Sequence, residues 1–205
     1  MKNQSITEAM LQFIEESPTA FHAAANVEAL LLENGFEKLE NLAEGALVPG
    51  GSYYTMQNGS AVLAVKIPEN PAKGFRIAAS HSDSPCFKIK EVPEMKVENT
   101  YVKLNVEKYG GMILSPWLDR PLSVAGRVFV AGKDGKPEAK LVNLKKDLLI
   151  IPNVAIHFNR EINNGFAYNP QTDMAPLMGL DQELSIKRLC AEAADVAEEE
   201  ILGSD

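Results

Sequence analysis

The sequence has little cysteine and no long apolar run. Only two cysteines, Cys86 and Cys190, occur among 205 residues, and they lie far apart, so the sequence does not predict a secreted disulfide framework. No apolar stretch approaches the roughly 20 residues of a membrane-spanning helix. The start, Met1-Lys-Asn-Gln-Ser, lacks the apolar core of a secretion signal. We therefore expect a cytoplasmic protein in a reducing compartment, with no membrane partner.

Positive charge is also scarce. Lys and Arg total 20 against 28 Asp and Glu, which gives a formal net charge of −8. This balance disfavours nucleic acid as a partner, because phosphate binding needs clustered Lys and Arg. The composition is otherwise that of an ordinary globular protein. The length suits one or two domains of about 100–200 residues each.

The first 91 residues predict a layer of helices on strands. Ser5 and Glu8 form a Ser-x-x-Glu capping box at a helix start. Asn58-Gly59 supplies the two positive φ angles of a tight hairpin turn. The predicted elements are helices over 5–16 and 20–34, a hairpin over 53–67 and a short buried strand over 75–80. This order of elements indicates an α/β arrangement.

Strand-like runs dominate after Phe87. The predicted strands cover residues 87–92, 101–107, 122–131, 139–144, 148–151 and 154–158, and Gly132-Lys-Asp-Gly135 is predicted to be a hairpin turn. We therefore expect a β-rich unit over residues 92–180. Asp181 then caps a predicted helix from Gln182 to about Leu202, in which Glu198-Glu199-Glu200 form a solvated face.

His81 and Asp83 form the sharpest local chemical signal. They follow the predicted strand 75–80, and functional groups of open α/β sheets gather at the carboxyl ends of strands. A neutral imidazole is a good zinc ligand, and a nearby carboxylate can accept the other ring N–H and set the tautomer. Because His-x-Asp is a short motif, a structural His–Asp pair stays open beside a metal site.

His157 is a second candidate. It lies in the predicted strand 154–158, ahead of a polar cluster at 160–164. An imidazole there can be a packed core side chain, or it can ligate a metal or hydrogen-bond a substrate near neutral pH. Residue type and spacing leave both interpretations open.

Trp117, Asp119 and Arg120 bring two opposite charges next to a large aromatic. Such a group suits either a structural ion pair or an anchor for an interface or a substrate. Cys86 has no base placed beside it in sequence, which favours a small buried hydrophobe over a nucleophile. Gly110-Gly111 lacks the Lys-Ser/Thr of a phosphate loop, so nucleotide binding is not predicted.

Several blocks along the chain form a specific set. They are Ser17-Pro-Thr-Ala-Phe-His-Ala23, Pro49-Gly-Gly-Ser-Tyr-Tyr54, Asn58-Gly-Ser60, His81-Ser-Asp-Ser-Pro-Cys86, Tyr109-Gly-Gly111, Trp117-Leu-Asp-Arg120, Ala125-Gly-Arg127, Ile151-Pro-Asn-Val-Ala-Ile-His157 and Asn163-Asn164. In this order the set resembles the aspartyl aminopeptidase family of dinuclear zinc peptidases. The resemblance covers nearly the whole chain.

The resemblance implies an α/β fold class in three parts. Residues 1–91 match the N-terminal part of an α/β/α zinc-peptidase sandwich. Residues 92–180 match an inserted β-rich dimerisation or lid domain. Residues 181–205 match a helix and the beginning of a return to the catalytic domain.

The resemblance also implies roles for single residues. His81 matches a zinc ligand, and Asp83 matches the carboxylate that orients this histidine at the catalytic site. His157 matches a family histidine near the active site, either as a metal ligand or as a substrate-binding contact delivered to a neighbouring subunit. Its position in the inserted domain makes the second role physically attractive.

Other matches are architectural. Asp119 and Arg120, with Trp117, match an inserted-domain motif with an interface or structural role. Pro121 stands where many relatives carry an acidic residue, and Ser82 replaces a common threonine.

The activity implied by the resemblance is that of a metal-dependent aminopeptidase, an exopeptidase that removes N-terminal residues, acidic ones by the family's name, with zinc-activated water. Two zinc ions would serve each complete site, and cobalt or manganese could replace them. Peptide substrates, and copies of the same chain joined through the β-rich domain into a dimer-based larger homo-oligomer, are the implied partners.

The remaining catalytic blocks of the family are not found in these 205 residues. They carry a bridging aspartate, a glutamate pair that supplies the base and a ligand, and late aspartate and histidine ligands. We therefore expect an N-terminal portion that is inactive alone. A non-catalytic assembly or binding module derived from the same family is the alternative.

Overall fold

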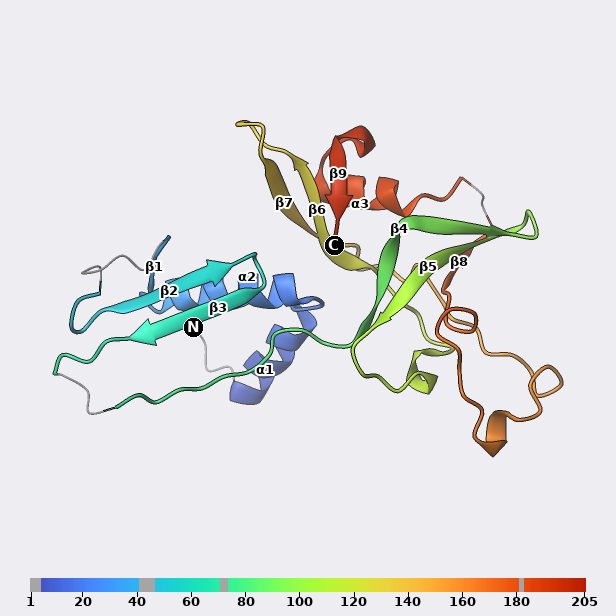
Figure 1. Ribbon diagram of the computed structural model, residues 1–205, viewed down its shortest axis with the longest axis horizontal. Helices are drawn as coiled ribbons and strands as arrows, with labels where there is room; N and C mark the ends of the chain where they lie inside the picture. The colour runs from blue at the N-terminus through green and yellow to red at the C-terminus, as the bar shows by residue number, and fades with distance from the viewer. Residues whose placement is uncertain (1–4, 41–46, 71–73, 181–182) are drawn as a thin grey trace. The chain divides into compact units, whose positions relative to one another are not determined.

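The computed structural model describes residues 5–40, 47–70, 74–180 and 183–205 (Figure 1). The chain forms two compact units that divide between Ser84 and Pro85. The boundary expected near residue 92 falls inside the strand β4 (Cys86–Val97) of the second unit. Within the described ranges, no helix is both long enough and apolar enough to cross a membrane.

Two capped helices open the first unit. The helix α1 (Ile6–Glu15) begins after Ser5, whose hydroxyl accepts a hydrogen bond from the Glu8 amide at 3.2 Å, while the Ser5 amide donates to the Glu8 carboxylate at 2.9 Å. This reciprocal pair confirms the predicted capping box. The helix α2 (Ala20–Glu33) is followed by Gly35 with a φ of 76°, a conformation that glycine adopts without strain.

A small sheet accompanies these helices. Its order is β1 (Glu37–Lys38), β2 (Ser52–Gln57) and β3 (Ala61–Lys66), with β2 parallel to β1 and antiparallel to β3. Asn58 and Gly59 have φ of 53° and 68°, which confirms the predicted hairpin turn. Figure 1 shows α2 running behind β2 and β3, and Tyr54 of β2 donates a hydrogen bond to Glu28 of α2 at 2.9 Å.

The prediction of a buried strand over 75–80 is wrong for this structure. The segment is extended coil (green in Figure 1), and Phe75 and Ile77 are 93% and 85% exposed. An inner strand needs neighbours on both edges and elements covering both faces. Among the described residues the sheet ends at β3, and no strand pairs with this segment.

Two antiparallel three-stranded sheets build the second unit. One has the order β4, β5 (Tyr101–Tyr109) and β8 (Leu177–Gly179). The other has the order β7 (Pro137–Asn143), β6 (Ala125–Ala131) and β9 (Ile201–Ser204). The β6–β7 hairpin turns at Gly132-Lys-Asp-Gly135, as predicted, with the Gly132 amide donating to the Lys136 carbonyl at 2.8 Å.

Alternating side chains form the core of the second unit. Alternate residues in the first part of β5 are buried, namely Val102, Leu104 and Val106, as expected of a strand with one covered face. The helix α3 (Ile186–Ala194) contributes Ile186 to one apolar cluster and Ala191 and Ala194 to another. Half-buried Cys190 packs against both clusters, so α3 joins the two sheets.

The predicted strand over 154–158 is also wrong. Residues 156–158 form a turn, and the predicted strand 148–151 contributes isolated bridges at Leu149, Ile150 and Ile151 instead of a regular strand. A β-branched run favours extended backbone, but pairing decides whether a strand forms. His157 therefore lies in an exposed turn, not in a β run.

The predicted C-terminal helix is shorter than expected. Asp181 and Gln182 lie outside the described residues, and α3 begins after Ser185, whose hydroxyl accepts from the Arg188 amide at 3.2 Å. The helix ends at Asp195 with a φ of 54°. The segment Glu198–Glu200 forms a 3₁₀ turn (η3), and β9 follows. Pairing with β6 and the burial of Ile201 outweigh the helix propensity of this acidic stretch.

Candidate metal site

The turn at His81 and Asp83 brings the predicted pair together. The Nδ1 atom of His81 lies 3.0 Å from Oδ1 of Asp83 and 2.8 Å from the Asp83 backbone carbonyl. Because both partners are acceptors, Nδ1 carries the proton and Nε2 keeps its lone pair. This is the tautomer that a metal needs when it binds through Nε2. The two side chains are 82% and 43% exposed.

Sequence reasoning missed one contact of this turn. The Ser82 hydroxyl donates a hydrogen bond to the Ser60 carbonyl at 2.9 Å. Ser60 closes the β2–β3 hairpin, 22 positions earlier in the chain. A contact at this separation leaves no local pattern in the sequence, so no spacing rule could have found it.

The donor set at this turn suits zinc but is partial. Zinc sites combine imidazole, carboxylate or thiolate ligands and normally hold four ligands. In the part of the chain that the structure describes, no group of three or more His, Cys, Asp or Glu side chains could hold a metal ion. His81 therefore offers one imidazole ligand and an orienting carboxylate, and a complete zinc site needs further groups.

His157 belongs to the second unit. It is exposed in the turn 156–158, and the 3₁₀ helix η2 (Ile162–Asn164) follows. Its apolar neighbours Val154, Ile156 and Phe158 are 55%, 47% and 84% exposed. A packed core histidine is therefore not what the structure shows, and the metal or substrate role stays a prediction.

Trp117, Asp119 and Arg120 make separate contacts within the second unit. Trp117, at the end of the 3₁₀ helix η1 (Ser115–Trp117), meets the Phe87 ring edge-on with centroids 5.1 Å apart. The Asp119 carboxylate accepts from the Asn153 amide at 2.8 Å, and the Arg120 guanidinium donates to the Pro116 carbonyl at 3.5 Å.

These contacts bear on the expected ion pair. Asp119 has a φ of 55°, and its amide donates to the Ile151 carbonyl at 3.0 Å. Together with the Asn153 bond, this fixes the chain that leads toward His157. No ion pair joins Asp119 to Arg120 among the described contacts, and an interface role stays a prediction.

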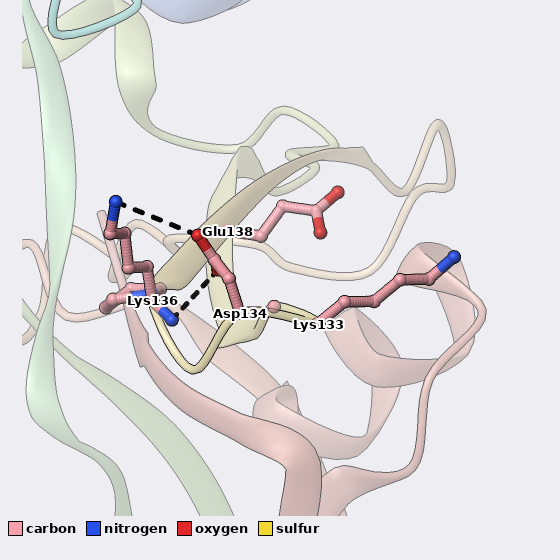
Figure 2. A pocket seen from close by; sticks show the side chains of 6 residues that line it. Lys133, Asp134, Lys136 and Glu138 are labelled. Carbon is pink, nitrogen blue, oxygen red and sulfur yellow. Dashed lines mark hydrogen bonds and ion pairs between the residues drawn. The ribbon is translucent and has the colours of Figure 1, made fainter.

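A surface hollow lies elsewhere, at the β6–β7 turn (Figure 2). It is an open space of about 600 Å³ along Gly132–Glu138. Asp134 accepts from the Lys136 amide at 3.1 Å and faces the Lys136 ammonium at 3.8 Å, as the dashed lines show. None of the predicted site residues lines this hollow, and its polar contacts hold the turn.

Cys86 and Cys190 form no disulfide in the described structure. Cys86 begins β4, and Cys190 is half-buried in α3. Burial raises the pKa of the Cys190 thiol, which opposes the thiolate form that a nucleophile requires. This agrees with a packing role for Cys190.

Comparison with known proteins identifies relatives of this chain. A family model described as aminopeptidase I zinc metalloprotease (M18) matches residues 13–203. A probable M18 family aminopeptidase 2 from Clostridium acetobutylicum is 47% identical over 184 residues, which are 88% of this chain and 42% of that protein. One from Clostridium novyi is 42% identical over an alignment of 214 positions, which covers 100% of this chain and 49% of that protein.

Solved structures share the fold. A cryo-EM structure of the Ape4 and Nbr1 complex matches with a TM-score of 0.87 and 32% identity, over 96% of this chain and 42% of the matched chain. The S. cerevisiae mApe1 dodecamer matches in fold, with a TM-score of 0.79 and 22% identity over 98% of this chain and 47% of the matched chain. The chain thus spans less than half the length of these relatives, and it belongs to the M18 family of aminopeptidase I zinc metalloproteases.

Proposed function

We propose that this chain is the N-terminal half of a zinc aminopeptidase subunit and supplies His81 as a zinc ligand. The observation that carries the proposal is the bond from the His81 ring to Asp83, which leaves Nε2 as the basic nitrogen. Membership of the M18 family supports the same role. The relatives are about twice as long as this chain, which supports a second half that completes the site.

Each residue of the pair has a defined task. His81 would hold zinc through Nε2, and Asp83 would hold the ring proton on Nδ1 and so keep the ring in the ligating tautomer. Bound zinc would polarise the peptide carbonyl and lower the pKa of a water molecule. A complete site would hold two zinc ions, and cobalt or manganese suits the same donors.

The sheet of the first unit has an unpaired edge among the described residues, which supports the proposed α/β/α catalytic sandwich. The edge of β3 is open among the described residues, and the side chain of Leu63 is 60% exposed. The unpaired segment 75–80 carries Phe75 and Ile77 into solvent. Strands from a second half would cover these apolar side chains and provide the remaining zinc ligands and the general base. The 205 residues alone would then lack peptidase activity.

The second unit would serve self-association. Its exposed turn carries His157 between Ile156 and Phe158, both solvent-exposed. Apolar side chains in contact with solvent favour burial at an interface. A copy of the chain docked there would receive His157 near its own site, as a substrate contact or a metal ligand. The mApe1 relative is a dodecamer, which supports a dimer-based larger homo-oligomer.

Peptides with a free N-terminus, whose first residue is acidic or neutral, are the proposed substrates, and the cytoplasm is the proposed compartment. Two cysteines that are not joined in a disulfide among the described residues suit a reducing environment.

A non-catalytic assembly module is the second candidate. It is favoured by one observation, the lack of a complete metal-ligand group among the described residues. In that case the β-rich unit would bind full-length subunits.

Two measurements test the proposed function. Peptides that begin with Glu, Asp or Leu are incubated with the 205-residue chain, with and without chelator, and with His81→Ala in parallel. We expect no hydrolysis by the chain alone. In the full-length subunit, His81→Ala should remove bound zinc and activity together. A variant that keeps its full zinc content by elemental analysis would contradict the ligand role of His81.

A further inference from the structure

A side-chain hydrogen bond ties the His81 turn to the β2–β3 hairpin. The Ser82 hydroxyl donates to the Ser60 carbonyl at 2.9 Å, while the two residues flanking Ser82 bond to each other through the His81 ring. Ser82 thus lies between His81 and Asp83 in the turn, and its hydroxyl bonds the turn to the hairpin. We propose that Ser82 is a positioning residue for His81, an inference that rests on the zinc-ligand role proposed above.

The hairpin is a rigid anchor. Asn58 and Gly59 adopt the two left-handed conformations of the turn, and the Ser60 amide donates to the Gln57 carbonyl at 3.1 Å. The Ser60 carbonyl is therefore held by a closed turn on two fully paired strands. Tyr54 of β2 is 2% exposed and bonds to Glu28 of α2, so the strands are themselves fixed to a helix.

The His81 turn is not rigid by its own packing. The preceding segment 74–80 is exposed throughout, and the His81 side chain is 82% exposed. The bonds from the His81 ring to Asp83 fix the ring within the turn. These two bonds lie within the turn, whereas the Ser82 bond ties the turn to the sheet, because its acceptor lies on another element.

The proposal depends on a hydroxyl at position 82, which makes it testable with close variants. Threonine keeps the donor and alanine removes it. Ser80→Ala is the matched control, since Ser80 is an exposed serine of the same segment with no hydrogen bond among those that the structure describes. We expect Ser82→Thr and Ser80→Ala to behave as the native chain, and Ser82→Ala to differ.

The first measurement is an NMR comparison of the turn in the 205-residue chain without metal. In the native chain, nuclear Overhauser contacts should join Ser82 to Ser60, and the backbone of residues 81–83 should be as rigid as the hairpin. Ser82→Ala should raise the share of molecules in which the turn has left the hairpin by about three- to tenfold, the effect expected of one hydrogen bond, while the bond between His81 and Asp83 is kept. An unchanged position and mobility of the turn in Ser82→Ala would overturn the positioning role.

The second measurement is zinc binding by the full-length subunit, because no group of three or more ligand side chains gathers among the described residues. We expect Ser82→Ala to weaken zinc binding by about three- to tenfold, which is less than the 10- to 100-fold typical of a direct partner of the ligand. Ser82→Thr should stay within about twofold of the native subunit. Full zinc content in His81→Ala would overturn the ligand role, whereas a turn displaced from the hairpin in Ser82→Ala alone would still establish the positioning bond. The two proposals therefore fail separately.

Discussion

Asp205 joins the end of β9 to two cations, and its replacement tests how the second unit is held together. Its carboxylate lies 2.9 Å from Nζ of Lys88 and 3.0 Å from Nη2 of Arg127. The backbone of Asp205 also exchanges hydrogen bonds with Arg127, at 2.8 and 2.9 Å. We predict that Asp205→Asn destabilises the second unit without removing β9, because the backbone bonds remain.

The size of the effect follows from exposure. The side chains of Lys88 and Asp205 are 42% and 33% exposed, so this pair contributes about 0–1 kcal/mol after solvent screening. Arg127 is 17% exposed, and its charged hydrogen bond contributes about 1–2 kcal/mol. We therefore expect a loss of about 1–2 kcal/mol, which for a unit of this size lowers Tm by about 3–10 °C.

The effect should depend on pH in one direction. The hydrogen bond from Lys88, followed by that from Arg127, holds the pKa of Asp205 below its ordinary value of 3.8, although partial burial opposes them. A carboxyl group with a lowered pKa in the folded state contributes stability above its unfolded pKa. The difference between native and variant should be constant from pH 7 to about pH 5. It should shrink as the pH falls below 3.8 and through the folded pKa.

Thermal unfolding by circular dichroism across this pH range is the assay, at low and high salt. Asp134→Asn is the control, since it removes the same charge from an exposed pair with Lys136 at 3.8 Å. The control should change stability by less than about 0.5 kcal/mol. An Asp205→Asn effect no larger than the control, or one that grows as the pH falls, would refute the reasoning.

Three further predictions concern packing and local backbone, all measured by urea unfolding. Leu104→Ala should cost about 2–5 kcal/mol because Leu104 is fully buried, whereas Leu63→Ala, at a 60% exposed position, should cost less than about 1 kcal/mol. Gly59→Ala should cost about 1–2 kcal/mol because φ is 68°, and Gly74→Ala, whose added methyl meets no atom within 4 Å, is its control. Thr19→Ala should cost about 1 kcal/mol because the Thr19 hydroxyl accepts from the His22 amide at 3.3 Å at the start of α2, whereas Thr19→Ser keeps the cap.

Features set by neighbouring residues could be predicted from the sequence. Three such features depend on contacts across a few positions, and all three occur in the structure. They are the Ser5–Glu8 capping box, the Asn58-Gly59 turn and the Gly132–Gly135 turn. The bond between His81 and Asp83 belongs to the same class, because its partners are two positions apart in the chain. The local half of the candidate site was therefore readable from the sequence.

Features decided by distant contacts were not predicted. The C-terminal helix stops at Asp195 because Ile201 is buried on β6, a strand about 70 positions earlier in the sequence. The run around His157 has the composition of a strand but finds no partner, and it forms a turn. Propensity favours a conformation by a fraction of a kcal/mol per residue, and tertiary pairing outweighs it.

The segment 75–80 shows a third case, in which the pattern and the structure disagree for a reason that bears on function. Phe75 and Ile77 have the residue types of a buried strand, yet both are almost fully exposed. Exposing two such side chains forfeits about 1.5–3 kcal/mol each relative to burial. The His81 ring follows directly on this segment, and the Ser82 bond fixes its turn to the hairpin in the absence of a paired strand. Further strands that cover residues 75–80 would bury these side chains and would also bring their own residues to the His81 turn. Completion of the sheet and completion of the proposed metal site would then occur together.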